Sequence, residues 1–477
     1  MIKYLIFSLF AAFICLSFVQ IKGSKNVVIG YTKKQLADSA KAAINYKNLC
    51  GKCHGEKVDA FVDRTWKYGS TSENLFKGIK QGYMDKGMPA FESILPDDQI
   101  VALSEYISGG VTRLKRYSFG SVVPTSNLFT SEEQNIKLDT IVKGVASPWG
   151  FTFLPSGEIL MTEKSGKIYR VAKDKSMHLI SGVPEVLAEG QGGLLDVILH
   201  PNFKKNQLIY ISYSAVKRED GATLGTTAIM CAKLNGDKLE EKNVIFEALP
   251  YSKARHHYGS RLVFGKDGFL YFSVGERGNE KVNPQSLTND LGKIHRITDD
   301  GKVPADNPFV NTPGAKPTIF GYGNRNPQGL MLNKSNGQIW EIEHGPRGGD
   351  EINIIGAGKN YGWPVICYGI NYNNKIISNK TAMEGMEQPL HYWLPSIAPS
   401  GMTFVEGDRY KAWKGDLMVG SLRFKYLNRC KMKNGKVVGE ELLLKNIGRV
   451  RDVIMGPDGY LYISVENPGF IFKLLPV

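Results

Sequence analysis

The chain has 477 residues, more than a single hydrophobic core usually organises, so its length favours several modules or one large repetitive fold. Its 42% hydrophobic and 22% charged residues are typical of globular proteins and exclude intrinsic disorder and a long coiled coil. The 52 glycines, about 11% of the chain against a usual ~7%, indicate many tight turns and therefore many short strands. The net charge of +14 is spread without runs of Lys or Arg, which disfavours nucleic-acid binding and leaves anionic ligands or solvation as explanations.

Residues 1–24 have the layout of a secretory signal peptide. Lys3 precedes an apolar run from Tyr4 to Ile21, and small polar residues follow. We therefore expect an exported, periplasmic protein. About 18 apolar residues can just span a bilayer, so an uncleaved N-terminal anchor is the alternative.

The next segment carries the pattern Cys50-Gly-Lys-Cys53-His54. Two thiols at this spacing on one helical turn reach the two vinyl groups of a haem, and the following imidazole then lies under the iron. The pattern predicts a c-type haem held covalently by Cys50 and Cys53, with His54 as an axial ligand. A metal-binding or redox-active Cys pair is the alternative, but it does not need His54, and no second pair has this spacing.

A haem iron with a sixth protein ligand needs another donor downstream. Met88 lies in a Gly-Met-Pro turn and is the predicted thioether ligand, with Met84 as its competitor. An amphipathic helix is predicted from Asp97 or Asp98, either of which can cap it, to Ile107. Residues 25–111 resemble a small helical class I cytochrome c. Residues 112–134 lack periodicity and are predicted to form a linker or packed strap.

One phrase recurs in approximate form along the remaining chain, as an apolar strand, a turn with Pro, Asp, Asn or Gly, and a second strand. The six copies are 150–171, 197–214, 262–278, 330–346, 402–422 and 453–474. Their spacing suits four-stranded blades, so residues 135–477 are predicted to form an all-β six-bladed β-propeller. A strand at 136–142 is expected to close the ring against the last blade.

The connections between these repeats carry a second set of phrases. They are Glu189–Asp196, His256–Phe264, Gly323–Gly329, Glu343–Glu351, Asn360–Pro364 and Gly448–Asp452. In this order they resemble the soluble sugar dehydrogenases that use pyrroloquinoline quinone (PQQ). The resemblance covers the whole module and implies a quinoprotein propeller joined to its own cytochrome.

PQQ is a flat quinone with three carboxylates, so its site needs fixed cations. Arg449 and Arg451 share a face if they lie on one strand, and there they can bind carboxylates. The resemblance assigns both to PQQ binding, together with Asn326 and Arg423, and implies that Gln191 contacts sugar or cofactor. The alternatives are surface charges and ordinary polar turns.

The oxidation of a sugar hydroxyl needs a base for the proton. His257 is the predicted general base, because an imidazole titrates near neutral pH, and His256 is its neighbour or orienter. Arg325 is predicted to stabilise negative charge on the quinone oxygen. A histidine satisfied within the core is the alternative.

Calcium prefers hard oxygen donors, including backbone carbonyls. The resemblance implies that the carbonyls of Gly345 and Pro346 hold a catalytic Ca²⁺. It also links Asp350, Glu351 and Tyr361 to a structural Ca²⁺, although carboxylates in a turn are often only solvated.

Three positions depart from the glucose-oxidising members of the family. His256 replaces an acidic residue, His344 replaces Gln, and Arg423 replaces a cofactor-binding Lys, a role that Lys425 fills if the alignment shifts. These changes leave the substrate open.

The sequence therefore predicts an exported PQQ-, Ca²⁺- and haem-dependent dehydrogenase that oxidises the C1 hydroxyl of an aldose to a lactone and passes electrons through the haem to a downstream acceptor. A dehydrogenase of a non-aldose alcohol or aldehyde is one alternative. A non-catalytic ligand-binding propeller with a redox-sensing cytochrome is the other. Cys231, Cys367 and Cys430 allow at most one disulfide, and the oligomeric state stays open.

Overall fold

The computed structural model describes residues 33–54, 58, 61, 66–112, 116–117, 119, 124–373 and 375–477. The predicted signal peptide lies outside these residues. Within the described part of the chain, no helix combines the length and apolar character needed to cross a membrane.

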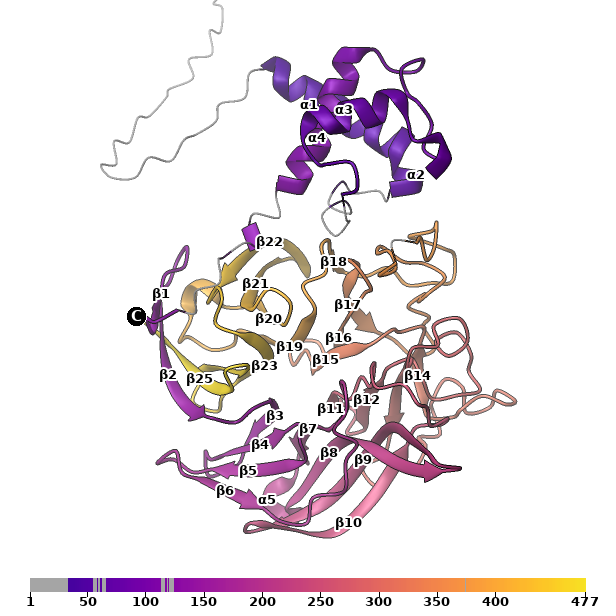
Figure 1. Cartoon of the computed structure of the whole chain (residues 1–477). Helices are drawn as coiled ribbons and strands as arrows, with labels where there is room; N and C mark the ends of the chain where they lie inside the picture. Colours follow the sequence, from indigo (N-terminus) through magenta and orange to yellow (C-terminus); the bar gives the residue numbers. More distant parts are fainter. Residues whose placement is uncertain are drawn as a thin grey trace, which may run out of the picture.

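The N-terminal part is helical, as predicted (Figure 1). Helix α1 (Lys33–Asn45) runs through a π-helical turn (Tyr46–Cys50) into the short α2 (Gly51–His54), so the haem-attachment pattern ends the first helical segment. Helix α3 (Ser72–Gln81) begins after Thr71, whose Oγ1 accepts the Asn74 N–H at 3.3 Å. A 3₁₀ turn (Met84–Lys86) leads to α4 (Asp97–Thr112).

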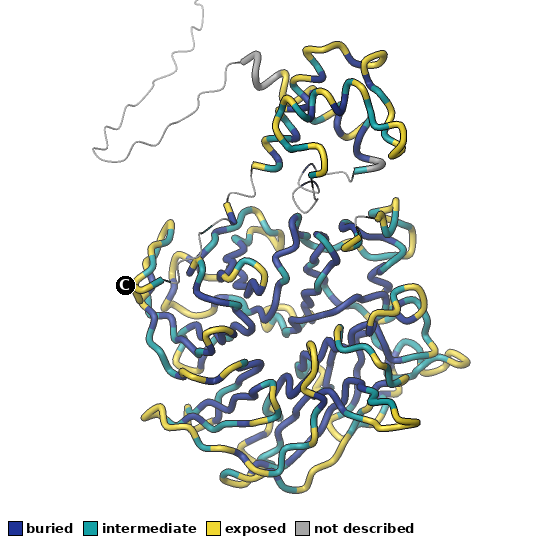
Figure 2. The backbone as a smooth tube through the Cα atoms, viewed as in Figure 1, coloured by how far each residue is buried: buried dark blue, intermediate teal, exposed yellow. Residues whose placement is uncertain are grey.

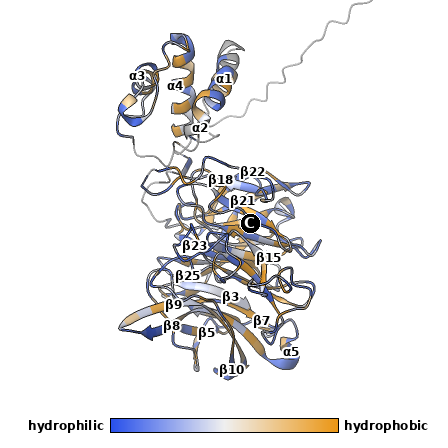
Figure 3. Ribbon diagram, turned by 90° about the vertical axis from the view of Figure 1, so that its right-hand side faces the viewer, coloured by the Kyte–Doolittle hydropathy of each residue, from blue (hydrophilic) through white to orange (hydrophobic). Residues whose placement is uncertain are grey.

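Helix α4 contributes one apolar face to the core of this small domain. Ile100, Leu103 and Ile107 are buried on one face, as their spacing predicts, and Figure 3 shows hydrophobic residues recurring along the helix. The predicted cap is different: α4 begins at Asp97, so Asp97 and Asp98 both lie in its first turn. Carboxylates in the first turn interact favourably with the partial positive charge of the helix N-terminus.

The C-terminal part is a ring of six antiparallel sheets, which confirms the predicted six-bladed propeller (Figure 1). Blade one contains β3 (Pro148–Phe153), β4 (Ile159–Glu163), β5 (Lys167–Val171) and β6 (Met177–Ile180). Blade two contains β7 (Leu194–Leu199), β8 (Leu208–Glu219), β9 (Ala222–Asn235) and β10 (Lys238–Glu247). Blade three contains β11 (Leu262–Phe264), β12 (Leu270–Val274), β13 (Lys293–Ile297) and β14 (Ile319–Tyr322). A short helix, α5 (Phe203–Asn206), connects β7 to β8.

The next two blades are β15 (Pro327–Leu332), β16 (Ile339–Glu343), β17 (Asp350–Ile355), β18 (His391–Trp393); and β19 (Pro399–Phe404), β20 (Leu417–Ser421), β21 (Tyr426–Lys433), β22 (Lys436–Leu443). A 3₁₀ turn (Lys411–Trp413) lies between β19 and β20. Each repeated phrase of the sequence overlaps the first two strands of one blade and includes the turn between them.

The sixth blade closes the ring. It contains β23 (Arg449–Met455), β24 (Leu461–Glu466), β25 (Phe470–Pro476), β2 (Ile136–Lys143) and β1 (Leu128–Phe129). Strand β2 pairs with β25, with Ile136 opposite Pro476 and Lys143 opposite Phe470. This confirms the predicted closing strand at 136–142.

The first strand of each blade lies next to the ring axis and contacts the first strands of its neighbours. In five blades the hairpin of strands one and two has a register shift near its start, and in β23 this shift falls between Val450 and Asp452. A bulge re-aims the side chains around it. The axial strands are buried and the outer turns are exposed (Figure 2).

The segment 112–134, predicted as a linker or packed strap, packs on the propeller at residues that the structure describes, which its polar composition alone does not indicate. Helix α4 continues to Thr112, and β1 pairs with β2. Tyr117 is only 7% exposed and belongs to a hydrophobic cluster between blades four and five. The aromatic residues in this polar segment account for the difference, because they add buried apolar contacts that no periodic pattern reveals.

Candidate functional site

The helical domain contains a cavity of about 510 Å³ where the sequence predicts a haem. Cys50, His54 and Met88 line it together with Ile107 of α4. Met84 is 75% exposed and is not among the lining residues, so the cavity favours Met88 as the sixth ligand. The side chain of Cys53 lies outside what the structure describes.

Aromatic rings cover part of this cavity. The His54 ring stacks on Phe61 with centroids 5.0 Å apart, and Phe61 stacks on Trp66 at 5.4 Å. All three side chains line the cavity. An apolar, aromatic wall around an imidazole suits a haem, whose faces are apolar and whose potential depends on burial.

A second cavity, of about 270 Å³, lies at one end of the propeller axis. Its walls come from the connections between blades, from those between the second and third strands of a blade, and from the adjoining ends of the first and second strands. The lining residues are Trp149, Lys164, Gly190, Gln191, Leu195, Tyr258, Gly259, Gln328, His344, Ala398, Leu422, Arg449, Arg451 and Glu466. We call this space the cofactor cavity.

Cations outnumber carboxylates in this lining. Arg451 Nε donates to Glu466 at 2.8 Å and Arg449 Nε donates to the same carboxylate at 3.1 Å. Burial opposes the charge on Glu466, but the two guanidiniums lower its pKa to about 2. Lys164 adds a third cation, which burial destabilises by lowering its pKa. With three cations and one carboxylate, the lining fits an anionic ligand.

His257 lies beside this cavity and contacts a buried carboxylate. Its Nδ1 contacts Glu276 Oε1, and its backbone N–H donates to Gln191 Oε1 at 2.7 Å. Burial, reinforced by the Arg325 charge, lowers the pKa of His257 well below its usual value. The ring is therefore neutral near pH 7, with Nδ1 directed at Glu276 and Nε2 left to accept a proton.

The sequence predicts His256 as the neighbour or orienter of His257. In the structure it is Glu276 that contacts Nδ1 of His257 and so orients its ring. Burial raises the pKa of Glu276 to about 7. The His256 ring touches His257 edge-on, with centroids 4.5 Å apart, and the His256 residue is exposed.

Arg325 and Asn326 form the turn before β15. Arg325 Nη1 donates to the carbonyls of His344 at 3.0 Å and Gly345 at 2.9 Å. Asn326 Oδ1 accepts the Gly259 N–H at 3.2 Å, so this side chain holds the turn after His257. Buried Glu343 accepts the backbone N–H groups of both residues.

The predicted calcium ligands lie in two different settings. Gly345 and Pro346 are buried beside Arg325, which shares the Gly345 carbonyl. Asp350 accepts four hydrogen bonds from the chain, including one from the Gly345 N–H at 2.8 Å, and so pins this loop.

Glu351 accepts a hydrogen bond from Asn353 at 3.3 Å, and the Tyr361 hydroxyl donates to the Ile354 carbonyl at 3.0 Å. Among the described residues, no group of three or more His, Cys, Asp or Glu side chains is arranged to hold a metal ion.

Arg423 lies near the cofactor cavity but is not among its lining residues. It is exposed and donates to the Ser396 carbonyl at 3.0 Å, and Lys425 is also exposed. Lys164, on the connection after β4, supplies the lining cation instead. His344 lines the cavity, donates through Nε2 to the Pro399 carbonyl at 2.8 Å, and has its pKa lowered to about 3 by burial.

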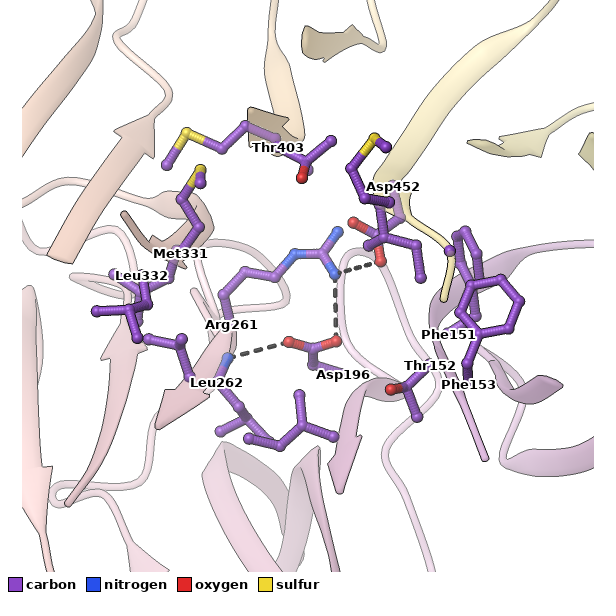
Figure 4. Close-up of a pocket in the computed structure, with 18 of the residues that line it drawn as sticks. Phe151, Thr152, Phe153, Asp196, Arg261, Leu262, Met331, Leu332, Thr403 and Asp452 are labelled. Carbon is purple, nitrogen blue, oxygen red and sulfur yellow. Dashed lines mark hydrogen bonds and ion pairs between the residues drawn. The ribbon is translucent and has the colours of Figure 1, made fainter. Parts of the chain in front are cut away.

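A larger axial cavity, of about 740 Å³, opens at the other end of the ring (Figure 4). A charged layer separates it from the cofactor cavity. Arg261 Nη1 bonds Asp196 at 3.2 Å and Asp452 at 3.0 Å, and its guanidinium lies 4.3 Å from the ring centroid of Trp149. Trp149 lines the cofactor cavity, so this layer forms its floor.

The sequence missed Lys164, Glu276 and Glu466. A signal for the two carboxylates exists in the repeats, because five of the six second strands end at or within two residues of a glutamate: Glu163, Glu219, Glu276, Glu343 and Glu466. The leftover cysteines, Cys231, Cys367 and Cys430, are buried free thiols.

Comparisons with known proteins agree with this geometry. Residues 145–473 match the family described as glucose/sorbosone dehydrogenase, and residues 37–107 match the one described as cytochrome c oxidase, cbb3-type, subunit III. The aldose sugar dehydrogenase of Escherichia coli is 40% identical over 349 residues, which cover 72% of this chain and 93% of that protein.

Solved structures give the same result. The apo-form of the soluble Escherichia coli aldose sugar dehydrogenase has a TM-score of 0.69 at 37% identity, covering 72% of this chain and all of that one (100%). The PQQ-bound aldose sugar dehydrogenase of Streptomyces coelicolor has a TM-score of 0.60 at 27% identity, covering 73% and 99%. The chain therefore belongs to the glucose/sorbosone dehydrogenase family, with a cbb3-type cytochrome c domain preceding its propeller.

Proposed function

We propose that the protein is an exported PQQ-dependent aldose dehydrogenase that oxidises the C1 hydroxyl of a sugar to a lactone and delivers the electrons to its own c-type haem. The observation that carries this proposal is the His257–Glu276 contact beside a cavity rich in cations. The PQQ-bound relative supports the choice of cofactor, and residues 1–24 support export.

The chain's residues have separate tasks in this reaction. Lys164, Arg449 and Arg451 bind the carboxylates of the cofactor, and Gln191 holds the backbone of His257. His257 accepts the hydroxyl proton at Nε2, while Arg325 stabilises negative charge. PQQ, when bound, would supply a two-electron acceptor for the hydride that leaves the sugar C1.

We also propose that Ca²⁺ binds at the carbonyls of Gly345 and Pro346. Backbone carbonyls are donors that Ca²⁺ accepts, and the Asp350 hydrogen bonds fix the loop that carries them. In the helical domain, Cys50 and Cys53 would hold the haem covalently, with His54 and Met88 as its axial ligands. The haem would supply a one-electron acceptor, so the two electrons from each sugar would require two reductions of the iron and an external one-electron acceptor to reoxidise it.

The test is a substrate panel read by the haem absorbance of the purified holoprotein, with and without PQQ and Ca²⁺. We expect aldoses to reduce the haem only when both are added. The panel includes non-aldose alcohols and aldehydes, because His256 and His344 change the site relative to glucose-oxidising relatives. Reduction by those compounds alone would replace the aldose assignment, and no reduction by any compound would favour a binding propeller.

A further inference from the structure

The segment that joins the two domains is seated on the propeller through aromatic stacking. Tyr117 stacks on Phe424 with ring centroids 4.4 Å apart and an interplanar angle of 10°, and lies 6.0 Å from Tyr426. Phe119 meets the Tyr426 ring edge-on at 5.8 Å. Arg116 Nη2 reaches Glu440 at 3.5 Å. We call Arg116, Tyr117 and Phe119, with these partners, the linker anchor.

The linker anchor is closely packed against the propeller around the buried Tyr117. Tyr117 is 7% exposed, and its cluster includes Trp340, Trp393 and Tyr426, so it fills a space between blades four and five. Such parallel ring pairs add to the free energy gained by burial alone. The reaction chemistry of the propeller does not need these contacts, because none of the three linker residues lines the cofactor cavity.

The anchor's place on the propeller is close to that cavity. Phe424 lies in the connection between β20 and β21, two residues after Leu422, which lines the cofactor cavity. Two residues of chain span at most about 7 Å. The point at which the linker is held is therefore at the rim of the proposed redox site.

The short stretch of chain between α4 and the linker anchor limits the distance between the haem cavity and the anchor. Helix α4 ends at Thr112, and three residues separate it from Arg116, a span of at most about 14 Å. Ile107, a wall of the haem cavity, lies about 7.5 Å before the end of α4 along the helix axis. Connectivity thus holds that wall within about 22 Å of the anchor.

We propose that the linker anchor positions the haem domain beside the cofactor cavity and thereby sets the rate of electron delivery to the haem. A tether raises the effective concentration of two sites only if it keeps them within reach, and a tether fixed at the cavity rim explores a smaller volume than a free one. This inference rests on the proposed function. It assigns Tyr117 and Phe424 as positioning residues, since neither touches substrate or cofactor.

The experiment compares Tyr117→Ala and Phe424→Ala with two matched controls in the full-length holoprotein. Tyr117→Phe keeps the ring, and Tyr372→Ala removes a tyrosine that is 66% exposed between β17 and β18 and is not part of the anchor. Three quantities are measured: haem reduction by sugar, reduction of a small soluble dye by sugar, and the rate of trypsin cleavage after Arg116 without sugar or PQQ. The dye reaches the propeller without the tether, so it reports the dehydrogenase alone.

We expect the two alanine variants to reduce haem about tenfold more slowly, since the anchored population falls with its stacking contacts. Dye reduction should stay at the parent level, trypsin should cleave faster, and both controls should behave as the parent. Unchanged cleavage would show that the anchor does not hold the linker, and faster cleavage with unchanged haem reduction would show that it does not set the rate. A parent protein that reduces neither dye nor haem would refute the proposed function, and the trypsin comparison would still decide whether the anchor exists.

Discussion

The carboxylate of Glu276 contacts Nδ1 of His257, and both side chains are shielded from solvent at the rim of the cofactor cavity. A carboxylate in this position fixes the tautomer of the imidazole and stabilises the imidazolium that forms when the ring takes a proton. The two residues therefore act as one catalytic unit, in which His257 reacts and Glu276 positions it.

Replacement of Glu276 by Gln should lower kcat by about 10²-fold, the lower end of what general base catalysis contributes. Gln cannot ionise, so the pH dependence that Glu276 contributes through its pKa of about 7 should disappear from the kcat/KM profile. Steady-state kinetics across pH 5–8 check both effects. Glu241→Gln, at an exposed position on β10, is the control. A Glu276→Gln enzyme with the parent's kcat and pH profile would contradict the pairing.

Replacement of His257 by Ala should lower kcat by about 10²–10⁴-fold, because the hydroxyl proton loses its acceptor. The haem absorbance spectrum should be unchanged, since the haem cavity lies in the other domain. His256→Ala should cost less, because its ring only contacts His257 edge-on. Turnover retained in His257→Ala would remove this residue from the reaction.

Replacement of Lys164 by Met should weaken PQQ binding by about 10–100-fold, the loss expected for a hydrogen bond to a charged group. Lys167→Met, three residues later at the exposed start of β5, is the matched control and should bind as the parent does. Titration of the apo-protein with PQQ, followed by tryptophan fluorescence, gives both affinities. Equal affinities would place Lys164 outside the binding site.

Replacement of Met88 by Ala should remove the thioether from the haem iron and lower the haem potential, while Met84→Ala should change neither property. The reason is placement: Met88 lines the haem cavity and Met84 is exposed. Redox titration and visible spectra of the two variants distinguish them. The reverse pattern would assign the ligand to Met84.

Replacement of His344 by Gln should make the protein relatively more stable as the pH falls below about 6.5. Burial lowers the pKa of His344 in the folded state to about 3, so between these values the unfolded chain binds more protons than the folded one. The parent therefore loses up to about 1.4 kcal/mol per pH unit relative to the variant. Urea unfolding at pH 7, 6, 5 and 4 measures the difference, which a pH-independent gap would refute.

The fold was predictable because each repeat contains its own strand and turn patterns within about 20 consecutive residues. The phrase 453–474, for example, holds two apolar strands and the turn between them, and the ladder of β23, β24 and β25 follows from it. The linker anchor was not predictable, because the partners of Tyr117 lie more than 300 residues away in the chain. Nothing near Tyr117 in the sequence distinguishes a buried tyrosine from a solvated one.

The site was predictable where the residues that act together lie close together in the sequence. Arg449 and Arg451 lie on the same strand, and both bond Glu466, as two cations sharing a face can. Glu276 and Lys164 were missed because their roles depend on contacts between separate connections of the ring. The resemblance implied that Arg423 binds PQQ, but the cofactor cavity is lined by Lys164, which lies on another blade, and not by Arg423.

The pairing of β2 with β25 has a consequence for biosynthesis. The two strands are joined by more than 300 residues of intervening chain, and ribosomes release that chain from the N-terminal end. Strand β2 cannot pair with β25 until Phe470–Pro476 has been synthesised, so the ring stays open until then. This late closure is compatible with the export that we propose, because the sixth blade joins the ring only after the other five have been made.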